Sequence, residues 1–224
     1  MPNSELYLSI LSPQMTQRDL LKTISDLHSL IDGVHFDVMD GKFVEANTLY
    51  WQTPKLLRVL KNEFPNLKYS VHLMTLHPHS YIRRYAAAGA QEIFVHCEAT
   101  SLNQIGVIAY KLRKRKVKVG LAINPETNLN TFSKVSNVLD SVLIMSVHPG
   151  TGGQKFILDV CDKVQKVAQK FPKVEIAVDG GIDAKYAEFL KILGTKQIVV
   201  GSAILKQKHP FEAAYKIKKI LKQN

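Results

Sequence analysis

The sequence is poor in cysteine and contains no long hydrophobic run. Its two cysteines, Cys97 and Cys161, are far apart and belong to no paired motif, which excludes a disulfide framework and predicts reduced thiols. No apolar stretch approaches the roughly 20 residues that span a bilayer. The N-terminal sequence MPNSELYLSILS lacks the basic and long apolar segments of a signal peptide. We therefore expect a cytoplasmic protein that does not associate with membranes.

Acidic residues are in the minority, with 19 Asp and Glu against 30 Lys and Arg, a net charge of +11. A basic chain can indicate a nucleic-acid partner. Here the positive residues concentrate at positions 111–118 and 216–222, in or just after expected helices, and no aromatic residues alternate with them. This pattern is typical of solvated helix faces. We expect no nucleic-acid partner, and at most a general attraction for small anionic substrates.

Short apolar runs alternate with longer amphipathic ones along all 224 residues. The expected strands are 6–10, 34–39, 68–74, 92–97, 118–123, 141–147, 174–179 and 197–201. The expected helices are 16–31, one that begins at Pro54, 80–88, 103–114, 129–136, 158–170, 184–193 and 211–221. Eight strand–helix units predict a single (β/α)₈ barrel over residues 1–224. The rival, a doubly wound open sheet, would carry a G-x-G-x-x-G motif after the first strand, and none is present.

A cluster of candidate metal ligands falls at the ends of three expected strands. His35 and Asp37 are two residues apart in one strand and so share a face. His72 lies in the next strand, and Asp179 ends the seventh. Two imidazoles and two carboxylates suit Zn, Fe, Mn or Co. Each residue alone also fits a structural role, as a core histidine, a loop anchor or a turn residue, and spacing alone leaves both interpretations open.

Three glycine-bearing segments follow late strands, at 148–154, 179–182 and 200–203. Backbone N–H groups of such loops can surround an anion, and barrel enzymes often hold phosphate there; the alternative is that the glycines only form tight turns. No GKS or GKT follows a glycine loop, so nucleotide hydrolysis is not indicated.

Other residues near the strand ends have less specific roles. Met39, Met74 and Met145 are either core filling or an apolar wall beside a substrate. Asp40 points opposite to Asp37 and is expected to be structural. His96 and Glu98 share a face at the end of the fourth strand, where they fit either support of the metal ligands or a subunit contact, without an assigned chemistry.

Six motifs together resemble the ribulose-phosphate 3-epimerase family: HFDVMDGKFV, VHLM, GLAINP, MSVHPGTGGQKF, VDGGI and GSAI, in family order. The resemblance implies a homo-oligomeric barrel enzyme of the pentose phosphate pathway that interconverts D-ribulose 5-phosphate and D-xylulose 5-phosphate. It implies one divalent metal ion on His35, Asp37, His72 and Asp179, with Asp37 and Asp179 as the acid/base pair. The substrate contacts it implies are Ser9, His72, Gly150, Thr151, Gly152, Gly153, Gly180, Gly181, Gly201 and Ser202.

The chain departs from the family pattern in the loops. Glu45-Ala46 replaces the usual Pro-Asn, His148 stands where an acidic residue or Asn is common, and Thr151 replaces Phe. The implied catalytic set is complete, so these changes leave the implied reaction type unaffected. The sugar itself stays open between a pentose 5-phosphate and a ketohexose 6-phosphate such as allulose 6-phosphate, and the Gly180-Gly181 and Gly201-Ser202 pairs favour the pentose. A non-catalytic sugar-phosphate-binding protein is the alternative from another class.

Overall fold

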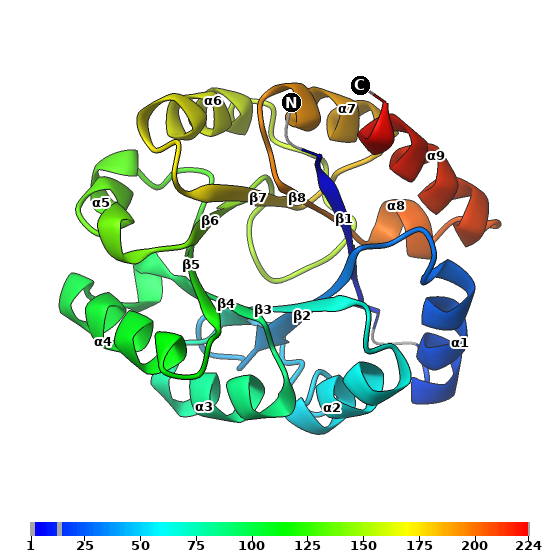
Figure 1. Cartoon of the computed structure of the whole chain (residues 1–224), viewed down its shortest axis with the longest axis horizontal. Helices are drawn as coiled ribbons and strands as arrows, with labels where there is room; N and C mark the ends of the chain where they lie inside the picture. The colour runs from blue at the N-terminus through cyan, green and yellow to red at the C-terminus, as the bar shows by residue number, and fades with distance from the viewer. Residues whose placement is uncertain (1–2, 13–14, 224) are drawn as a thin grey trace.

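In the computed structural model, which describes residues 3–12 and 15–223, eight parallel strands close into a barrel in chain order (Figure 1). The eight strands expected from the sequence are all present, and no end is shifted by more than two residues. They are β1 (Glu5–Ser9), β2 (Gly33–Met39), β3 (Lys68–Met74), β4 (Glu92–His96), β5 (Lys118–Ile123), β6 (Ser141–Met145), β7 (Glu175–Asp179) and β8 (Gln197–Val200). The predicted (β/α)₈ architecture is therefore confirmed.

Helices surround the strand ring (Figure 1). They are α1 (Gln17–Leu27), α2 (Pro54–Glu63), α3 (His79–Ala88), α4 (Leu102–Arg113), α5 (Leu129–Ser133), α6 (Val160–Lys170), α7 (Ala184–Ile192), α8 (Ser202–Leu205) and α9 (Pro210–Lys222), with 3₁₀ turns η1 (Cys97–Ala99) and η2 (Ser136–Val138). Within the described ranges, no helix is both long and apolar enough to cross a bilayer.

The helices differ most from the sequence expectation in two places. The described residues form nine helices where eight were predicted, because α8 is a single turn after β8 and too short to produce a periodic pattern. The first helix starts as expected, with Thr16 as its N-cap accepting from the Asp19 amide, but it ends at Leu27 rather than at position 31. The amides of Leu30 and Ile31 both donate to the Leu27 carbonyl, so the chain turns there.

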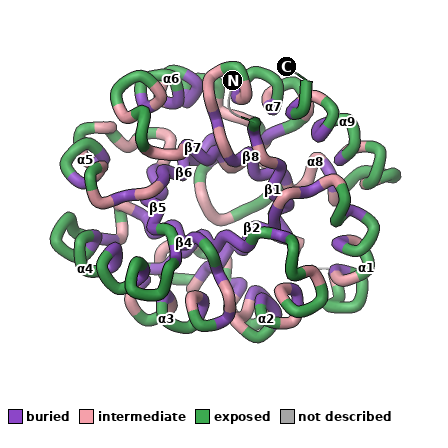
Figure 2. Tube along the Cα trace, viewed as in Figure 1, coloured by how far each residue is buried: buried purple, intermediate pink, exposed green. Residues whose placement is uncertain are grey.

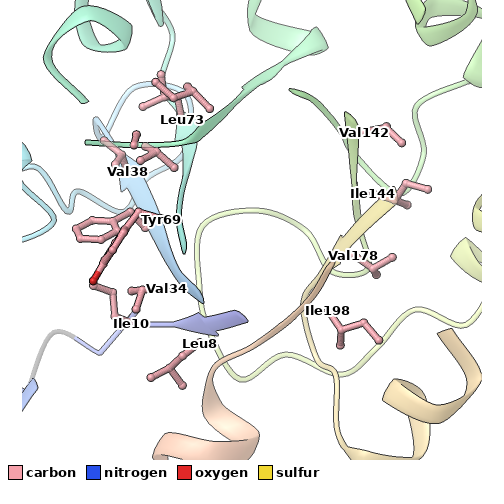
Figure 3. Close-up of a cluster of buried hydrophobic side chains, with 14 of the residues drawn as sticks. Leu8, Ile10, Val34, Val38, Tyr69, Leu73, Val142, Ile144, Val178 and Ile198 are labelled. Carbon is pink, nitrogen blue, oxygen red and sulfur yellow. The ribbon is translucent and has the colours of Figure 1, made fainter. Parts of the chain in front are cut away.

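The core between strands and helices is built from the outward-facing strand residues. Val34 and Val38 of β2 and Leu73 of β3 are fully buried and point away from the barrel interior (Figure 3). On the far side, Val178 of β7 and Ile198 of β8 do the same. Burial is therefore concentrated in the ring and on the helix faces toward it (Figure 2). This shell fixes the strand register that places the inward-facing polar residues.

The barrel interior beneath the site is filled by one aromatic ring. Phe94 of β4 pairs in register with Gly120 of β5, where a side-chain carbon would lie only 2.1 Å from the Phe94 ring. Phe94 clusters with Ala122, Leu143 and Ala177 from the neighbouring strands. The residue pair Phe94–Gly120 thus closes the centre of the barrel below the strand ends.

A buried carboxyl group lies at the opposite, N-terminal end of the barrel. Glu92 accepts a hydrogen bond from the Ser141 hydroxyl (2.5 Å) and another from the Gln197 amide. Burial raises the pKa of Glu92 above 4.5, and these two hydrogen bonds only partly oppose the shift. The Gln197 side-chain oxygen has no partner. If the Gln197 amide rotates, its oxygen can accept a hydrogen bond from a protonated Glu92 or from a glutamine at position 92.

We predict that Glu92→Gln removes a pH-dependent loss of stability. The pKa of Glu92 is higher in the folded than in the unfolded protein. Its contribution to the free energy of unfolding is therefore fully present below about pH 4.5 and is lost as pH rises through the folded pKa. The variant should match the native protein near pH 4.5 and exceed its free energy of unfolding by about 1 kcal/mol at pH 8. Urea unfolding at both pH values measures this; Glu188→Gln on the exposed face of α7 is the control. A native protein whose free energy of unfolding at pH 8 equals or exceeds that of the variant would contradict the prediction.

Candidate metal and active site

Four polar side chains from three strands converge at the C-terminal end of the barrel. His35 and Asp37 come from β2, His72 from β3 and Asp179 from the end of β7. Each offers one ligand atom, and these atoms all lie within 4.8 Å of one another. Parallel strands end on one face of a closed barrel, so the side chains meet although 142 residues separate Asp37 from Asp179 in the chain. The structure thus brings together the whole predicted ligand set.

The donor atoms fit a divalent metal ion. His35 Nδ1 lies 2.7 Å from the Ser70 hydroxyl, while its Nε2 is buried without any hydrogen-bond partner. That nitrogen lies 3.6 Å from Asp37 Oδ1. An unpaired buried nitrogen beside carboxylate oxygens is costly unless a cation or proton lies between them. His35, Asp37, His72 and Asp179 are therefore the residues that could hold the metal ion.

Asp37 is fixed by contacts from three directions. Its Oδ2 accepts a 2.7 Å hydrogen bond from the Ser9 hydroxyl on β1, and its Oδ1 lies 3.3 Å from His72 Nδ1. The backbone is held too, since the Asp37 carbonyl accepts from the Thr48 hydroxyl and its amide donates to the Gln52 side chain. The carboxylate therefore has one oxygen tied to Ser9 and the other facing the histidines.

Burial shifts the acid and base strengths of all four residues. It raises the pKa of Asp37 and raises that of Asp179 further, because the nearby Asp37 charge adds to the effect. Burial also lowers the pKa of His35 to about 4 and that of His72 well below its usual range. The histidines are thus neutral, as metal ligands must be, and the two carboxyl groups cannot both be ionised without a compensating cation.

A cavity of about 450 Å³ opens above this cluster. Asp37 and Asp179 reach its wall; His35 and His72 are fully buried beneath. The other substrate contacts expected from the sequence all line it: Ser9, Met39, Met74, Met145, Gly150, Thr151, Gly152, Gly153, Gly180, Gly181, Gly201 and Ser202. His72, the remaining substrate contact expected from the sequence, does not line the cavity; it is fully buried, and its Nδ1 lies 3.3 Å from Asp37 Oδ1. In this structure its contacts are with the ligand cluster rather than with the open space.

The glycine loop between β6 and α6 crosses the centre of the ring in Figure 1. The Gln154 side chain braces it by donating to the carbonyls of His148 (2.7 Å) and Thr151 (2.8 Å). Gly181 after β7 packs against the same loop with φ +63°, and a side-chain carbon there would lie 2.5 Å from the Phe156 amide nitrogen. Only glycine fits this approach. The two loops therefore form one continuous wall of backbone.

Several cavity residues were not predicted from the sequence. Lys206, after α8, reaches the glycine loop: a side-chain carbon on Gly153 would lie 3.2 Å from its Nζ. Asn47 and Trp51 also line the cavity, from the loop after β2. Nothing in the local sequence distinguishes Lys206 from the other lysines of this basic chain. Only its place two residues after the GSAI motif could have indicated it.

The residues left without a chemical role also have defined contacts. The Asp40 carboxylate accepts from the backbone amides of Lys42, Phe43 and Leu76, which outweigh the effect of burial and lower its pKa. These contacts support the structural role expected for it. His96 is fully buried within the barrel, and its Nε2 lies 2.7 Å from His72 Nε2. Its other nitrogen lies 2.9 Å from Glu98 Oε2.

Comparison with known proteins identifies the family of this chain. The model of the ribulose-phosphate 3-epimerase family matches residues 5–205. The chain belongs to this family, and it is an epimerase. A ribulose-phosphate 3-epimerase of Bacillus subtilis is 35% identical over 181 residues, covering 79% of this chain and 81% of its own. That of Schizosaccharomyces pombe is 32% identical over 183 residues, covering 81% and 78%.

A solved structure supports the fold more broadly. The 3-hexulose-6-phosphate synthase of Salmonella typhimurium is similar to this epimerase with a TM-score of 0.78, covering 97% of this chain and 98% of its own. At 19% sequence identity the similarity concerns the barrel alone.

The positions where this epimerase departs from the family pattern gather on one side of the cavity. Ala46 and Thr151 line both the main cavity and an adjoining one of about 440 Å³. His148 lines the main cavity, and its Nε2 lies 3.4 Å from Glu126 Oε1 at the surface. Glu45 lines the adjoining cavity only. The substitutions therefore change the wall of the site and not the cluster at its base.

Proposed function

We propose that this epimerase interconverts D-ribulose 5-phosphate and D-xylulose 5-phosphate by moving the proton on C3 of the sugar. The observation that carries the proposal is the pair Asp37 and Asp179 at the base of a cavity lined by glycine loops. The curated relatives in Bacillus subtilis and Schizosaccharomyces pombe are ribulose-phosphate 3-epimerases. The family resemblance, the cluster and the cavity all support the same reaction.

The two aspartates suit inversion at a carbon. They come from β2 and β7, which are separated in the ring by β1 and β8, so they can approach a bound sugar from different sides. One carboxylate removes the C3 proton to give an enediolate, and the other returns a proton to the opposite face. Their proximity raises the pKa of Asp179, which favours one protonated and one ionised carboxyl group, as this exchange requires.

His35, Asp37, His72 and Asp179 would hold a divalent metal ion of the Zn, Fe, Mn or Co type. When bound, such an ion supplies Lewis-acid stabilisation of the negative charge that develops on the sugar oxygens. Ser9 orients Asp37 through its 2.7 Å hydrogen bond. Met39, Met74 and Met145 form an apolar wall that excludes water from the reacting carbon.

The phosphate end of the sugar fits the opposite side of the cavity. The segments at 150–153, 180–181 and 201–202 line this side of the cavity, and a side-chain carbon at Gly153 would lie 3.2 Å from Lys206 Nζ. N–H groups of glycine loops bind anions, and a cation adds attraction for a phosphate dianion. We therefore assign the phosphate of the substrate to this side.

Replacing Asp179 by Asn should lower kcat by a factor of about 10²–10⁴, because an amide cannot exchange the C3 proton. Epimerisation in deuterated water by the native enzyme should place one deuteron at C3 of the product, measured by NMR. The control is Asp183→Asn four residues on, since Asn caps a helix as Asp183 caps α7. Full activity of Asp179→Asn, or unlabelled product, would contradict the proposal.

Replacing Lys206 by Met should raise KM for the phosphorylated substrate about tenfold, the effect of losing about 1.4 kcal/mol of binding. The value of kcat should change little, because the ammonium is remote from the aspartates. Lys208→Met, two residues away and outside the cavity lining, is the matched control. Equal KM values for the two variants would exclude a phosphate contact by Lys206.

A ketohexose 6-phosphate is the second candidate substrate. The specific observation is the adjoining cavity, which Ala46 and Thr151 join to the main one. A sixth carbon would find space there that a phenylalanine at position 151 would fill. A side-by-side assay of ribulose 5-phosphate and allulose 6-phosphate, before and after chelation, separates the two candidates and tests the metal requirement.

Thr151→Phe should reduce turnover of allulose 6-phosphate about tenfold more than turnover of ribulose 5-phosphate, an energy difference of about 1.4 kcal/mol. The ratio of the two rates in one enzyme preparation is insensitive to any loss of folded protein. An unchanged ratio would mean that the adjoining cavity plays no part in substrate choice.

A further inference from the structure

A chain of polar contacts runs from the candidate ligand His72 away from the cavity. His72 Nε2 lies 2.7 Å from His96 Nε2, and His96 Nδ1 lies 2.9 Å from Glu98 Oε2. The two imidazole rings are fully buried, with their centroids 4.9 Å apart. The Phe43 ring covers His96 at a centroid distance of 4.7 Å. We call these contacts, from His72 through His96 to Glu98, the His96–Glu98 relay. None of the three residues lines the cavity.

The far end of the relay is anchored firmly. Glu98 lies in η1, and its Oε1 accepts hydrogen bonds from the Asn124 amide (2.9 Å) and from the Thr127 hydroxyl. Both donors belong to the loop after β5. With one oxygen committed to that loop, the other faces His96 Nδ1 in a fixed direction. The relay therefore connects a residue on β3 to the loop after β5, across β4.

The positions of the protons follow from these contacts. An ionised carboxylate can only accept hydrogen bonds, so His96 Nδ1 must carry the proton that faces Glu98. With its proton on Nδ1, His96 presents Nε2 as the acceptor, and His72 Nε2 is then the donor across the 2.7 Å contact. That leaves His72 Nδ1 bare. This nitrogen lies 3.3 Å from Asp37 Oδ1 and 3.8 Å from Asp179 Oδ2.

We propose that His96 and Glu98 are positioning residues that hold His72 in the Nε2–H tautomer, with the bare Nδ1 directed at the metal position. A ligand histidine whose other nitrogen donates to a fixed acceptor keeps its orientation and gains basicity. His35 has the corresponding support from Ser70 at its Nδ1. The two histidines thus use different nitrogens, Nε2 of His35 and Nδ1 of His72, each determined by its own outer contact.

The alternative role for His96 and Glu98, a contact between subunits, does not fit His96. Its side chain has no exposed surface, and both of its nitrogens are already in contact within the chain. Glu98 has 24% of its side chain exposed, but both of its oxygens have partners. The relay is therefore an internal support of the ligand cluster.

The relay is tested first by the tautomer of His72. Long-range ¹⁵N–¹H NMR of the metal-free protein, assigned with a His72→Asn sample, distinguishes a protonated Nε2 from a protonated Nδ1. We expect Nε2–H in the native protein and a mixture of tautomers in Glu98→Ala. A native His72 that carries its proton on Nδ1 would overturn the proposal, and this measurement needs neither metal nor activity.

The second test is the affinity for Co²⁺, measured by competition with a chelator. His96→Leu and Glu98→Ala should each weaken binding about 10–100-fold, the usual effect of removing an outer partner of a metal ligand. His96→Gln, whose amide oxygen can replace the Nε2 acceptor, should recover most of the affinity. Glu188→Gln on the exposed face of α7 is the control for removing a carboxylate. Native affinity in His96→Leu would overturn the relay.

This inference rests on the metal site of the proposed function, and the two can fail separately. If the native protein binds no Co²⁺, the metal assignment fails, while the NMR result still decides whether the relay fixes His72. If the native protein binds Co²⁺ and His96→Leu binds it equally well, the metal site stands and the relay fails. If His96→Leu does not fold, Glu98→Ala and the native tautomer decide the question.

Discussion

Two carboxyl groups that share a buried site are the constraint around which this barrel is arranged. Asp37 is almost fully buried and Asp179 has 14% of its side chain exposed. Burial raises the pKa of both, and repulsion from the Asp37 charge raises the pKa of Asp179 further. A buried pair of this kind costs folding free energy, and neighbouring side chains fix its orientation. Two neutral histidines lie beside it, and a cavity opens above it.

The supporting contacts come from nearly every strand of one half of the ring. Ser9 on β1 holds Asp37, Ser70 on β3 holds His35, and His96 on β4 contacts His72. Below them the Phe94 ring fills the barrel opposite Gly120, so the cluster lies on a solid base rather than over a channel. A side chain held on two sides loses little further freedom when it binds a ligand. That preorganisation is what a site for proton transfer requires.

The substrate side of the cavity is built differently, from loops and not from strands. The glycine segments line this side, and Lys206 is brought to them by the single turn of α8. The positions that depart from the family pattern, Ala46, His148 and Thr151, all lie in this loop wall. In the proposed function, the reaction and the choice of substrate are therefore assigned to different parts of the barrel. Changes in the loop wall alter the shape of the cavity without moving the residues at the strand ends.

The alternation of strand and helix patterns was sufficient to predict the barrel, because each strand of a (β/α)₈ fold buries its outer face against helices and each unit repeats the same local signal. The alternation of side-chain direction along β2 was enough to place His35 and Asp37 on one face. The helix α8 was missed because one turn has no period. Lys206 was missed because its neighbour Gly153 comes from a loop 53 residues earlier.

The sequence by itself therefore determined the fold, the four residues at the strand ends and the glycine segments. These features depend on the local spacing of apolar residues and on the order of the motifs. Only the tertiary structure decided which nitrogen of each histidine faces the carboxylates, that His96 and Glu98 lie behind His72, and that the altered loop positions join two cavities. Those features depend on side-chain directions and on distances between strands, and no local pattern in one chain encodes either.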